Sequence, residues 1–491
     1  MDKKVIIVGA GIAGIATAIR LSTKGYQVTV FESNPYPGGK LSAFSLAQYR
    51  FDAGPSLFTM PHYVDELFEL CGEDPRMHFN YQKKAVACAY FWEDGTRLHA
   101  YSDQTKYLQE VEDKLGVAPS VLANYLTKAK KKYDLTVALF LEKSLHRWKT
   151  FLSFKTLKAL CHLPLFEISK SLHQVNTQAL KEPHLIQLYN RFATYNGSSP
   201  YQTPGIMSLI QHLESHYGTF IPEGGMVSIS KSLYALAKRQ GVQFHFNQKV
   251  EKIITAQNAA QGILVDGQSY FADYVVSNMD IFPTYRKLLP HVKAPEKILR
   301  QERSSSALIF YWGVEKSFPS LDLHNILFSE DYPGEFEAIF GTKHLFDDPT
   351  IYINITSKNV PDDAPKGHEN WFVMINTPAG KTIDWEKEIP LFRKFVLAKI
   401  ERVLGEKVAP FIAVEEVLSP PLIEEKTQSY LGALYGASSN NPMAAFLRHP
   451  NFSSQFKNLY FCGGSVHPGG GIPLCLLSAK IVSDDFSKLN D

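Results

Sequence analysis

The pattern of apolar residues at the start of the chain predicts a buried strand that leads into a helix. Residues 5–8 are all apolar and run into a Gly-x-Gly-x-x-Gly motif at 9–14, which opens a helix-like segment. A second apolar run at 28–31 ends in an acid, Glu32. Short continuous apolar runs are typical of strands buried in a parallel sheet. The pattern therefore predicts a strand–turn–helix–strand unit.

The spacing of the glycines in this unit indicates dinucleotide binding. Gly9 permits the tight turn, Gly11 lets the backbone approach a pyrophosphate, and Gly14 lets the helix pack closely on the strand. The phosphates would then lie at the positive end of the helix. Glu32 ends the second strand, where an acid accepts hydrogen bonds from a ribose. The alternative is a tight turn with no ligand, and the complete context of the motif favours the dinucleotide.

Related patterns return further along the chain. A Gly-Gly turn at 224–225 leads into a helix and several short strands, the last of them at 274–278. A strand at 459–461 meets a glycine-rich loop followed by a helix, which again places backbone amides at a helix N-terminus. Residues 285–415 are rich in strands and predict a second domain with an antiparallel sheet. Its expected strands are 307–314, 351–356, 371–377 and 411–417, with a helix at 387–404.

Composition and charge narrow the possible classes of protein. The chain has 491 residues, 45% of them hydrophobic, which is enough for two or three domains with a large core. A net charge of +2 gives no reason to expect a nucleic-acid partner. The five cysteines are irregularly spaced, so we expect neither a disulfide framework nor a metal site. No uncharged apolar stretch reaches about 18 residues, and we expect a cytoplasmic protein that is soluble or lies on a membrane surface.

One segment, 128–160, combines positive charge with large apolar side chains. It holds nine Lys and Arg against two acids, interleaved with Leu, Phe and Trp. This combination is typical of a surface that lies in a membrane interface. A pair of core helices with a solvated basic face is the alternative.

The chain resembles the FAD-dependent carotenoid desaturases of the bacterial phytoene-desaturase type along nearly its whole length. The C-terminal run is the most specific of the motifs that carry the resemblance. Within the family, the chain is most similar to the 3,4-desaturases that act on 1-hydroxylated carotenoids such as 1'-hydroxy-γ-carotene. The motifs are Gly9-x-Gly11-x-x-Gly14, Glu32, Pro37-Gly38-Gly39-Lys40, Asp52-Ala53-Gly54-Pro55, Gly224-Gly225, Ser277-Asn278-x-Asp280 and His467-Pro468-Gly469-Gly470-Gly471-Ile472-Pro473.

The resemblance implies an α/β fold with three parts. The first is a Rossmann-like FAD-binding domain of the amine-oxidase and phytoene-desaturase type, assembled from 1–65, 216–285 and 418–491. The second is a mixed-sheet substrate domain from 66–127 and 286–417. The third, 128–215, is a helical region that associates with the membrane.

The resemblance also implies which residues hold a non-covalent FAD. Lys40 stands where the family commonly has Arg, so it keeps the charge near the phosphates but loses the bidentate fork. Ser56 follows a Gly-Pro pair that forces a loop, and an ordinary turn is the alternative there. The implied contacts are Gly9, Gly11, Ala13 and Gly14 at the pyrophosphate, Glu32 at the ribose, Ser56 and Leu57 beside the flavin, Val250 at the adenine, Asn278 beside the nucleotide, and the backbone of Leu431, Gly464, Gly471 and Ile472 along the flavin.

The implied reaction removes two hydrogens from adjacent carbons of an apolar polyene, one as a hydride to FAD and the other as a proton. Positioning and exclusion of water are the tasks left to the protein. We find no acid–base pair, and the catalytic residues stay unassigned. His467 is a candidate, but shaping of its loop through backbone hydrogen bonds is the favoured role. Oxygen and a membrane quinone both remain open as the final electron acceptor.

A carotenoid resides in the bilayer, so the resemblance favours the membrane interpretation of 128–160 and makes this segment the mouth of a substrate tunnel. Several other functions use the same fold. They are phytoene desaturation, carotenoid isomerisation without net oxidation, flavin-dependent amine or porphyrinogen oxidation, and a non-enzymatic escort of lipidated proteins. The glycines at both ends of the chain favour a bound dinucleotide over the escort.

Overall fold

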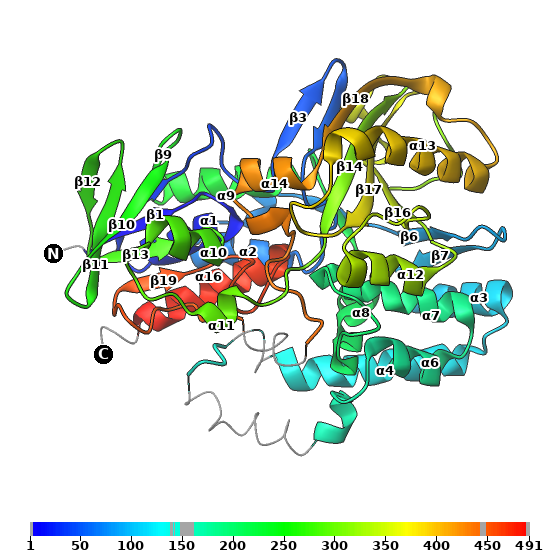
Figure 1. Ribbon diagram of the computed structural model, residues 1–491, viewed down its shortest axis with the longest axis horizontal. Coiled ribbons are helices and arrows are strands. Elements are labelled where there is room, and N and C mark those ends of the chain that lie inside the picture. Colours follow the sequence, from blue (N-terminus) through cyan, green and yellow to red (C-terminus); the bar gives the residue numbers. More distant parts are fainter. Residues whose placement is uncertain (1–2, 138–140, 142, 148–161, 442–447, 488–491) are drawn as a thin grey trace.

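The computed structural model describes residues 3–137, 141, 143–147, 162–441 and 448–487. Two large sheets lie side by side, with a group of helices below the second (Figure 1). The first sheet is parallel, and its strands come from three separate parts of the chain. In spatial order they are β19 (Leu459–Phe461), β13 (Tyr274–Ser277), β1 (Lys4–Val8), β2 (Gln27–Phe31) and β9 (Gln243–His245).

Alternate side chains of β1 enter two different cores, as expected for a strand covered on both faces. Val5 and Ile7 pack against helices on one face, whereas Ile6 and Val8 pack against a three-stranded antiparallel sheet on the other. Figure 1 shows this small sheet at the edge of the molecule. The helices are α1 (Ile12–Ser22), α2 (His62–Leu70), α9 (Val227–Arg239) and α16 (Ile472–Ser487), and the small sheet holds β10 (Val250–Ala256), β11 (Ala259–Val265) and β12 (Gln268–Phe271).

The second sheet has seven strands and is mixed. All neighbouring strands are antiparallel except β15 and β6, which are parallel and come from distant parts of the sequence. Helix α13 (Trp385–Leu404) covers one face through a core centred on Trp312 and Trp371. In spatial order the strands are β18 (Ile412–Leu418), β14 (Ser306–Val314), β17 (Glu369–Thr377), β16 (Ile351–Ile355), β15 (His324–Leu327), β6 (Val86–Phe91) and β7 (Arg97–Tyr101).

The mixed-sheet fold class is confirmed, and each expected strand of this region is present within two residues of its expected bounds. The simpler expectation of a purely antiparallel sheet is wrong for the β15–β6 pair. Short elements connect the large ones. They are the hairpin β3 (Ala43–Leu46) and β4 (Tyr49–Asp52), the pair β5 (Tyr81–Lys83) and β8 (Phe220–Pro222), and helices α10 (Ile281–Pro283), α11 (Glu296–Leu299), α12 (Tyr332–Phe336) and α14 (Pro420–Thr427).

Helices from 104–212 pack below β6 and β7 around a core rich in Tyr, Phe and Leu (Figure 1). They are α3 (Gln104–Leu115), α4 (Pro119–Thr136), α6 (Leu172–Leu180), α7 (Pro183–Asn190) and α8 (Ile210–His212). None of the helices in the described part of the chain is long and apolar enough to cross a bilayer.

The basic segment 128–160 does not present all its charges to solvent. Lys132 is buried and donates to Glu167 at 2.7 Å and to the Ser208 hydroxyl at 2.8 Å. Arg147 donates to Asp485 at 2.6 Å. The exposed cations described on α4 are Lys128, Lys130 and Lys131. Residues 138–140, 142 and 148–161, which include the expected Lys149, Lys155 and Lys158, lie outside the described residues.

Candidate cofactor site

The turn between β1 and α1 needs glycine at three positions, Gly9 for its backbone conformation and Gly11 and Gly14 for lack of space. Gly9 has a φ of +97°, which favours glycine. A Cβ at Gly14 would lie 2.2 Å from the carbonyl oxygen of Gly9, and one at Gly11 would lie 2.7 Å from Asn278 Oδ1. The turn therefore exposes bare backbone at the start of α1, where the first amides have no partner within the helix. This is a cradle for an anion such as a pyrophosphate, and Ala13 lies in the same first turn.

Asn278 joins the ends of three strands. Its Oδ1 accepts from the backbone N–H of Gly14 at 3.1 Å, and its Nδ2 donates to the carbonyl of Cys462 at 3.2 Å. Its own N–H donates to the carbonyl of Val8 at 2.8 Å. One side chain thus connects β13 to the first helix turn and to the residue after β19. Its position beside the nucleotide stays a prediction.

Glu32 is buried at the end of β2 with its carboxylate turned back toward the glycine turn. Oε2 accepts from the Ala10 N–H at 2.7 Å, and Oε1 accepts from the Asn34 N–H at 2.8 Å. Oε1 also accepts from the Asn34 side-chain amide at 3.0 Å and from the Ser33 hydroxyl at 3.2 Å. Oε2 accepts only the Ala10 N–H among the described residues, so the remaining acceptor position for a ribose hydroxyl is on Oε2. The Gln248 N–H donates to the Glu32 carbonyl at 2.9 Å, which brings the segment before Val250 beside this acid.

The segment 37–40 closes over the same turn. The Gly38 N–H donates to the Ala10 carbonyl at 2.7 Å, and a Cβ at Gly39 would lie 3.3 Å from the Gly11 Cα. Lys40 Nζ donates to the Leu434 carbonyl at 2.8 Å. Burial lowers the pKa of Lys40, and the nearby Asp280 carboxylate partly offsets this. Lys40 therefore links the N-terminal turn to the C-terminal segment, and its role at the phosphates stays a prediction.

The C-terminal glycine loop packs backbone against backbone. A Cβ at Gly464 would lie 3.2 Å from the Gly470 Cα, and one at Gly470 would lie 2.9 Å from the Tyr435 ring. By contrast, Gly471, with a φ of +109°, faces open space and precedes Ile472 at the start of α16. Leu431 also has a positive φ, +59°, which is unusual for a branched side chain and typical of functional sites. Of the residues expected to line the flavin with their backbone, Gly471 is thus accessible and Leu431 is strained.

His467 is held in this loop by the backbone. Its Nε2 lies 2.9 Å from the Lys143 carbonyl oxygen, and its N–H donates to the His449 carbonyl at 2.9 Å. Burial lowers the pKa of His467 to about 4, so the ring is neutral near pH 7 and Nε2–H donates. These contacts support the favoured role of shaping the loop.

One of the predicted flavin-side residues, Ser56, contacts the seven-stranded sheet. The Ser56 hydroxyl lies 2.9 Å from the Tyr352 hydroxyl, which lies 2.7 Å from His324 Nδ1. Leu57 follows, half-buried. Ser56 therefore stands where the parallel sheet's domain meets the mixed sheet, the position expected for a group beside both cofactor and substrate.

Asp52, part of the recognised motif, has a structural task. Its carboxylate accepts from the N–H groups of Met226 at 2.8 Å and Val227 at 3.0 Å, and from Arg50 at 2.6 Å. It thus stabilises the N-terminus of α9 as an acidic cap.

Sequence reasoning missed Arg448. This side chain is buried and donates to the carbonyls of Tyr435 at 2.8 Å and Gly464 at 3.4 Å. Burial lowers its pKa to about 10. It braces the two halves of the C-terminal loop, and no local motif marks it.

The parallel sheet begins with a bare-backbone turn, carries a buried acid at the end of the next strand, and is closed by a second glycine loop. This arrangement defines a dinucleotide-binding protein with a second, mixed-sheet domain. The chain belongs to the flavin containing amine oxidoreductase family, whose pattern matches residues 12–486. FAD is its cofactor, and the glycine cradle and Glu32 fit the pyrophosphate and ribose of such a group.

Characterised relatives extend the comparison. The chain is 57% identical to the 1-hydroxycarotenoid 3,4-desaturase of Flavobacterium sp. over 99% of this chain and 100% of that protein. It is 34% identical to the 4,4'-diapolycopene oxygenase of Methylomonas sp over 98% of each. Among solved structures, cyclohexylamine oxidase from Brevibacterium oxydans IH-35A superimposes with a TM-score of 0.63 at 15% identity, covering 100% of both chains. An oxidoreductase from Methanosarcina mazei gives a TM-score of 0.64 at 15% identity over 99% of this chain and 100% of that one. At such low identities these two structures show the fold alone.

Proposed function

We propose that this protein is an FAD-dependent desaturase that introduces a C-3,4 double bond into a 1-hydroxylated carotenoid such as 1'-hydroxy-γ-carotene. The observation that carries the proposal is the 57% identity to a 1-hydroxycarotenoid 3,4-desaturase across essentially the full length of both chains. The bare-backbone turn at 9–14 and the mixed-sheet domain beside it supply the two compartments that this chemistry needs.

The proposed cofactor contacts are supported by the geometry of the glycine turn and of the segments packed around it. Gly9, Gly11, Ala13 and Gly14 hold the pyrophosphate through the start of α1, and Glu32 holds the ribose. Val250 reaches the adenine from the segment that is hydrogen-bonded to Glu32. Asn278, Lys40, Ser56 and Leu57 surround the nucleotide and flavin, and Leu431, Gly464, Gly471 and Ile472 line the flavin with backbone groups.

When bound, FAD supplies a hydride acceptor. The residues around it orient the polyene and exclude water, because a delocalised allylic cation needs little charge from the protein. Apolar side chains on the face of the mixed sheet that carries Tyr352, such as Ile326 and Met374, suit this task. His467 contributes by holding the C-terminal loop in place.

The proposed domain division is supported by the two sheets. The parallel sheet takes its strands from 1–65, 216–285 and 418–491, and the mixed sheet takes nearly all of its residues from 66–127 and 286–417. Helix α4 runs across the boundary at 127–128. The helical region 128–215 is the proposed membrane-docking part, with the exposed Lys128, Lys130 and Lys131 nearest to anionic head groups.

The test is to incubate the protein and FAD with 1'-hydroxy-γ-carotene in liposomes, under air and anaerobically with a quinone. A product that has lost two hydrogens and absorbs at longer wavelength is expected. An absorbance change without a mass change would identify an isomerase instead. The electron acceptor is oxygen if turnover occurs under air and a quinone if it occurs in the anaerobic incubation.

A second candidate, oxygenation of a carotenoid, is favoured by the 34% identity to 4,4'-diapolycopene oxygenase. It predicts a gain of oxygen mass under air and no product under anaerobic conditions. The same mass analysis therefore separates the two activities.

A further inference from the structure

A chain of three hydrogen-bonded side chains runs from the loop after β4 into the mixed sheet. The Ser56 hydroxyl lies 2.9 Å from the Tyr352 hydroxyl, which in turn lies 2.7 Å from His324 Nδ1. Tyr352 is on β16, and His324 is on the neighbouring strand β15. The chain thus connects Ser56, a predicted flavin-side residue, to a buried imidazole.

Asn354 sets the direction of these hydrogen bonds. Its Nδ2 donates to the Leu323 carbonyl at 2.9 Å and lies 3.2 Å from His324 Nδ1. An amide nitrogen only donates, so Nδ1 accepts and the neutral ring carries its proton on Nε2. Tyr352 then donates to Nδ1, and Ser56 donates to Tyr352. No other side chain among the described residues donates to the Ser56 oxygen, so its lone pairs are free to accept a proton.

The loop that carries Ser56 is anchored to both halves of the molecule. A Cβ at Gly54 would lie 1.9 Å from the carbonyl oxygen of Lys40, so the loop packs directly on the segment that closes over the glycine turn. The carbonyl of Ala53 accepts from the Tyr311 hydroxyl, on the mixed sheet, at 2.8 Å. Ser56 is therefore held at the junction of the proposed cofactor and substrate compartments.

The sheet around Tyr352 is apolar. Tyr352 pairs with Ile326 on one side and with Met374 on the other, so these side chains flank its ring on the same face. Tyr352 and Met374 are both partly exposed. A polyene lying along this face would meet the Ser56 and Tyr352 hydroxyls as polar atoms among hydrocarbon. No carboxylate among the described residues hydrogen-bonds to either hydroxyl.

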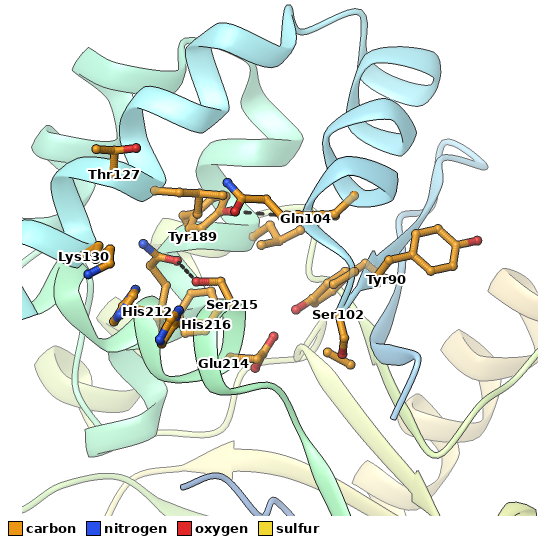
Figure 2. A pocket seen from close by; sticks show the side chains of 18 residues that line it. Tyr90, Ser102, Gln104, Thr127, Lys130, Tyr189, His212, Glu214, Ser215 and His216 are labelled. Atoms are coloured by element: carbon orange, nitrogen blue, oxygen red, sulfur yellow. Dashed lines mark hydrogen bonds between the residues drawn. The ribbon is translucent and has the colours of Figure 1, made fainter. Parts of the chain in front are cut away.

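A buried carboxylate on the helical side of the sheet is already paired and is separated from this chain. Glu214 Oε2 lies 3.3 Å from Arg191 Nη2, and both residues are buried. Figure 2 shows Glu214 and Tyr90 among the side chains that line a pocket there. Along the sheet, the buried Tyr90 and Ile326 lie between this pocket and Tyr352. Glu214 is thus out of reach of a substrate beside the flavin.

We propose that Ser56 takes up the proton that the carotenoid loses, and that Tyr352 and His324 relay it into the sheet. The inference rests on the proposed function, in which Ser56 lies beside the flavin and therefore beside the reacting carbons C3 and C4. Loss of a hydride from one of these carbons leaves a cation. The C–H bond of the other carbon then breaks, its electron pair forms the double bond, and its proton goes to the Ser56 oxygen.

The relay leaves both hydroxyls neutral. As Ser56 gains the substrate proton, its own proton passes to the Tyr352 oxygen, and the Tyr352 proton passes to His324 Nδ1. The imidazole gains one positive charge, which balances the charge lost by the carotenoid cation. The two electrons of the broken C–H bond stay in the new double bond.

Neutral His324 is a sufficient acceptor for this proton. Burial lowers its pKa to about 3, and the nearby Asp322 carboxylate partly offsets this effect. The ring is therefore unprotonated before each turnover. An allylic cation is a far stronger acid than an imidazolium ion, so the transfer is favourable even to this weak base. Once water reaches Ser56 after product release, the low pKa favours return of the proton along the same path.

The experiment measures the proton step apart from binding. The FAD-loaded protein is mixed without oxygen with liposomes that carry 1'-hydroxy-γ-carotene, and bleaching of the flavin absorbance is followed through a single turnover. Hydride loss is reversible until the neighbouring proton leaves, so the bleaching rate contains the proton step. Carotenoid binding is measured by quenching of protein fluorescence with reduced FAD in the site, which cannot accept a hydride. The dissociation constant of FAD is measured by flavin fluorescence.

Three variants interrupt the relay at successive positions: Ser56→Ala, Tyr352→Phe and His324→Asn. The His324→Asn variant keeps an acceptor for Tyr352 but has no base to hold the proton, and Ser56→Thr keeps the hydroxyl. Tyr107→Phe is the matched control. It removes a buried tyrosine hydroxyl on α3, in the helical core, that lies 3.4 Å from the Tyr189 hydroxyl.

Each interrupting variant is expected to slow bleaching about 100-fold or more, the usual contribution of a positioned proton acceptor. Their dissociation constants for FAD and for the carotenoid should stay close to those of wild type. Ser56→Thr and Tyr107→Phe should bleach at close to the wild-type rate. A wild-type rate in Tyr352→Phe or His324→Asn would overturn the inference, and so would a slowing matched by an equal loss of carotenoid affinity.

The relay and the proposed function fail in different ways. If wild type forms no product that has lost two hydrogens, the proposed function fails and the inference falls with it. If wild type desaturates the carotenoid but Tyr352→Phe and His324→Asn do so at the same rate, the function stands and the relay fails.

Discussion

The Oδ1 atom of Asn278 accepts a hydrogen bond from the backbone N–H of Gly14 at 3.1 Å, although the two residues are 264 positions apart. This contact occupies one of the free amides at the start of α1 and leaves those of Ile12 and Ala13 for a ligand. It also explains why Gly11 and Gly14 must be glycine, since a Cβ at either would lie within 3 Å of the Asn278 side chain.

Replacing Asn278 by Ala should therefore weaken both the fold and FAD retention. Loss of an N-terminal cap costs about 1 kcal/mol, roughly fivefold in an equilibrium constant. Asn278→Asp keeps the acceptor for the Gly14 N–H and should retain more of the stability of the apoprotein. Thermal unfolding with and without FAD, and the FAD dissociation constant, measure the two effects. An alanine variant with wild-type values for both would contradict the assigned role.

Glu32→Ala should release FAD. The substitution removes the ribose acceptor and leaves the Ala10 N–H without its 2.7 Å partner. Hydrogen bonds to charged groups contribute about 1.5–3 kcal/mol, so the FAD dissociation constant should rise roughly 10- to 100-fold. Glu32→Gln retains an acceptor and should lose less. Undiminished affinity in the alanine variant, measured by flavin fluorescence, would refute the ribose assignment.

Gly14→Ala tests the close packing of the turn. The added Cβ would lie 2.2 Å from the Gly9 carbonyl oxygen, so the helix must shift away from β1. We expect a loss of about 1–3 kcal/mol of stability, as for an overpacked core, together with loss of bound FAD. Gly25→Ala is the matched control, because its φ of +82° strains the backbone but nothing lies within 4 Å. That control should lower stability by roughly 1 kcal/mol and retain FAD. Equal FAD loss in both variants would point to general unfolding instead.

His324 should make the fold sensitive to acid. Burial lowers its pKa to about 3, whereas the unfolded chain has a value near 6.5. The unfolded state then binds more protons between these values, so stability falls as the pH drops from 6.5 toward 3. At pH 5 the contribution of His324 to this loss is about 2 kcal/mol.

His324→Asn should remove that part of the acid sensitivity, because asparagine does not titrate and still offers an acceptor to Tyr352. His184 provides a control of opposite sign. Burial lowers its pKa, but hydrogen bonds to Glu182 and Asp94 outweigh burial and raise it overall. Its stabilising effect is thus present at low pH and lost as the pH rises. Urea denaturation at pH values from 5 to 7 gives the free energy of unfolding as a function of pH. Its increase with pH should be smaller than in wild type for His324→Asn and larger for His184→Asn.

Charge reversal at Lys149, Lys155 and Lys158 should weaken binding to anionic liposomes. Each basic residue near an anionic surface contributes about 1 kcal/mol, so three reversals should lower the partition coefficient at least about 100-fold. Bound flavin should be unchanged. Reversal of Lys366, Lys381 and Lys407, which are exposed in the region of the mixed sheet, is the matched control. Vesicle sedimentation that shows equal binding for both triple variants would contradict membrane docking through 128–160.

The sequence predicted most of the fold where its signals are local. The strands at 307–314, 351–356 and 371–377 were recognisable because β-branched and aromatic residues cluster in them. The parallel pairing of β15 with β6 could not be recognised in the sequence, because no local feature determines which edge of a sheet a distant strand joins. The basic segment shows the same limit. Its composition favours a membrane surface, yet Lys132 is buried against Glu167 and Arg147 is bound to Asp485.

The sequence by itself determined the glycine turn, because a backbone that needs φ above zero or close packing admits only glycine. It also determined Glu32, because an acid at the end of the second strand belongs to the same dinucleotide-binding pattern. Tertiary structure alone decided that Asn278 caps α1, that Lys40 reaches Leu434, and that Arg191 and Glu214 form a buried ion pair. These contacts join residues that are distant in the chain, and no motif specifies which of them meet. Their energies depend on burial and on the distance between polar groups, and both quantities exist only once the sheets and helices have packed.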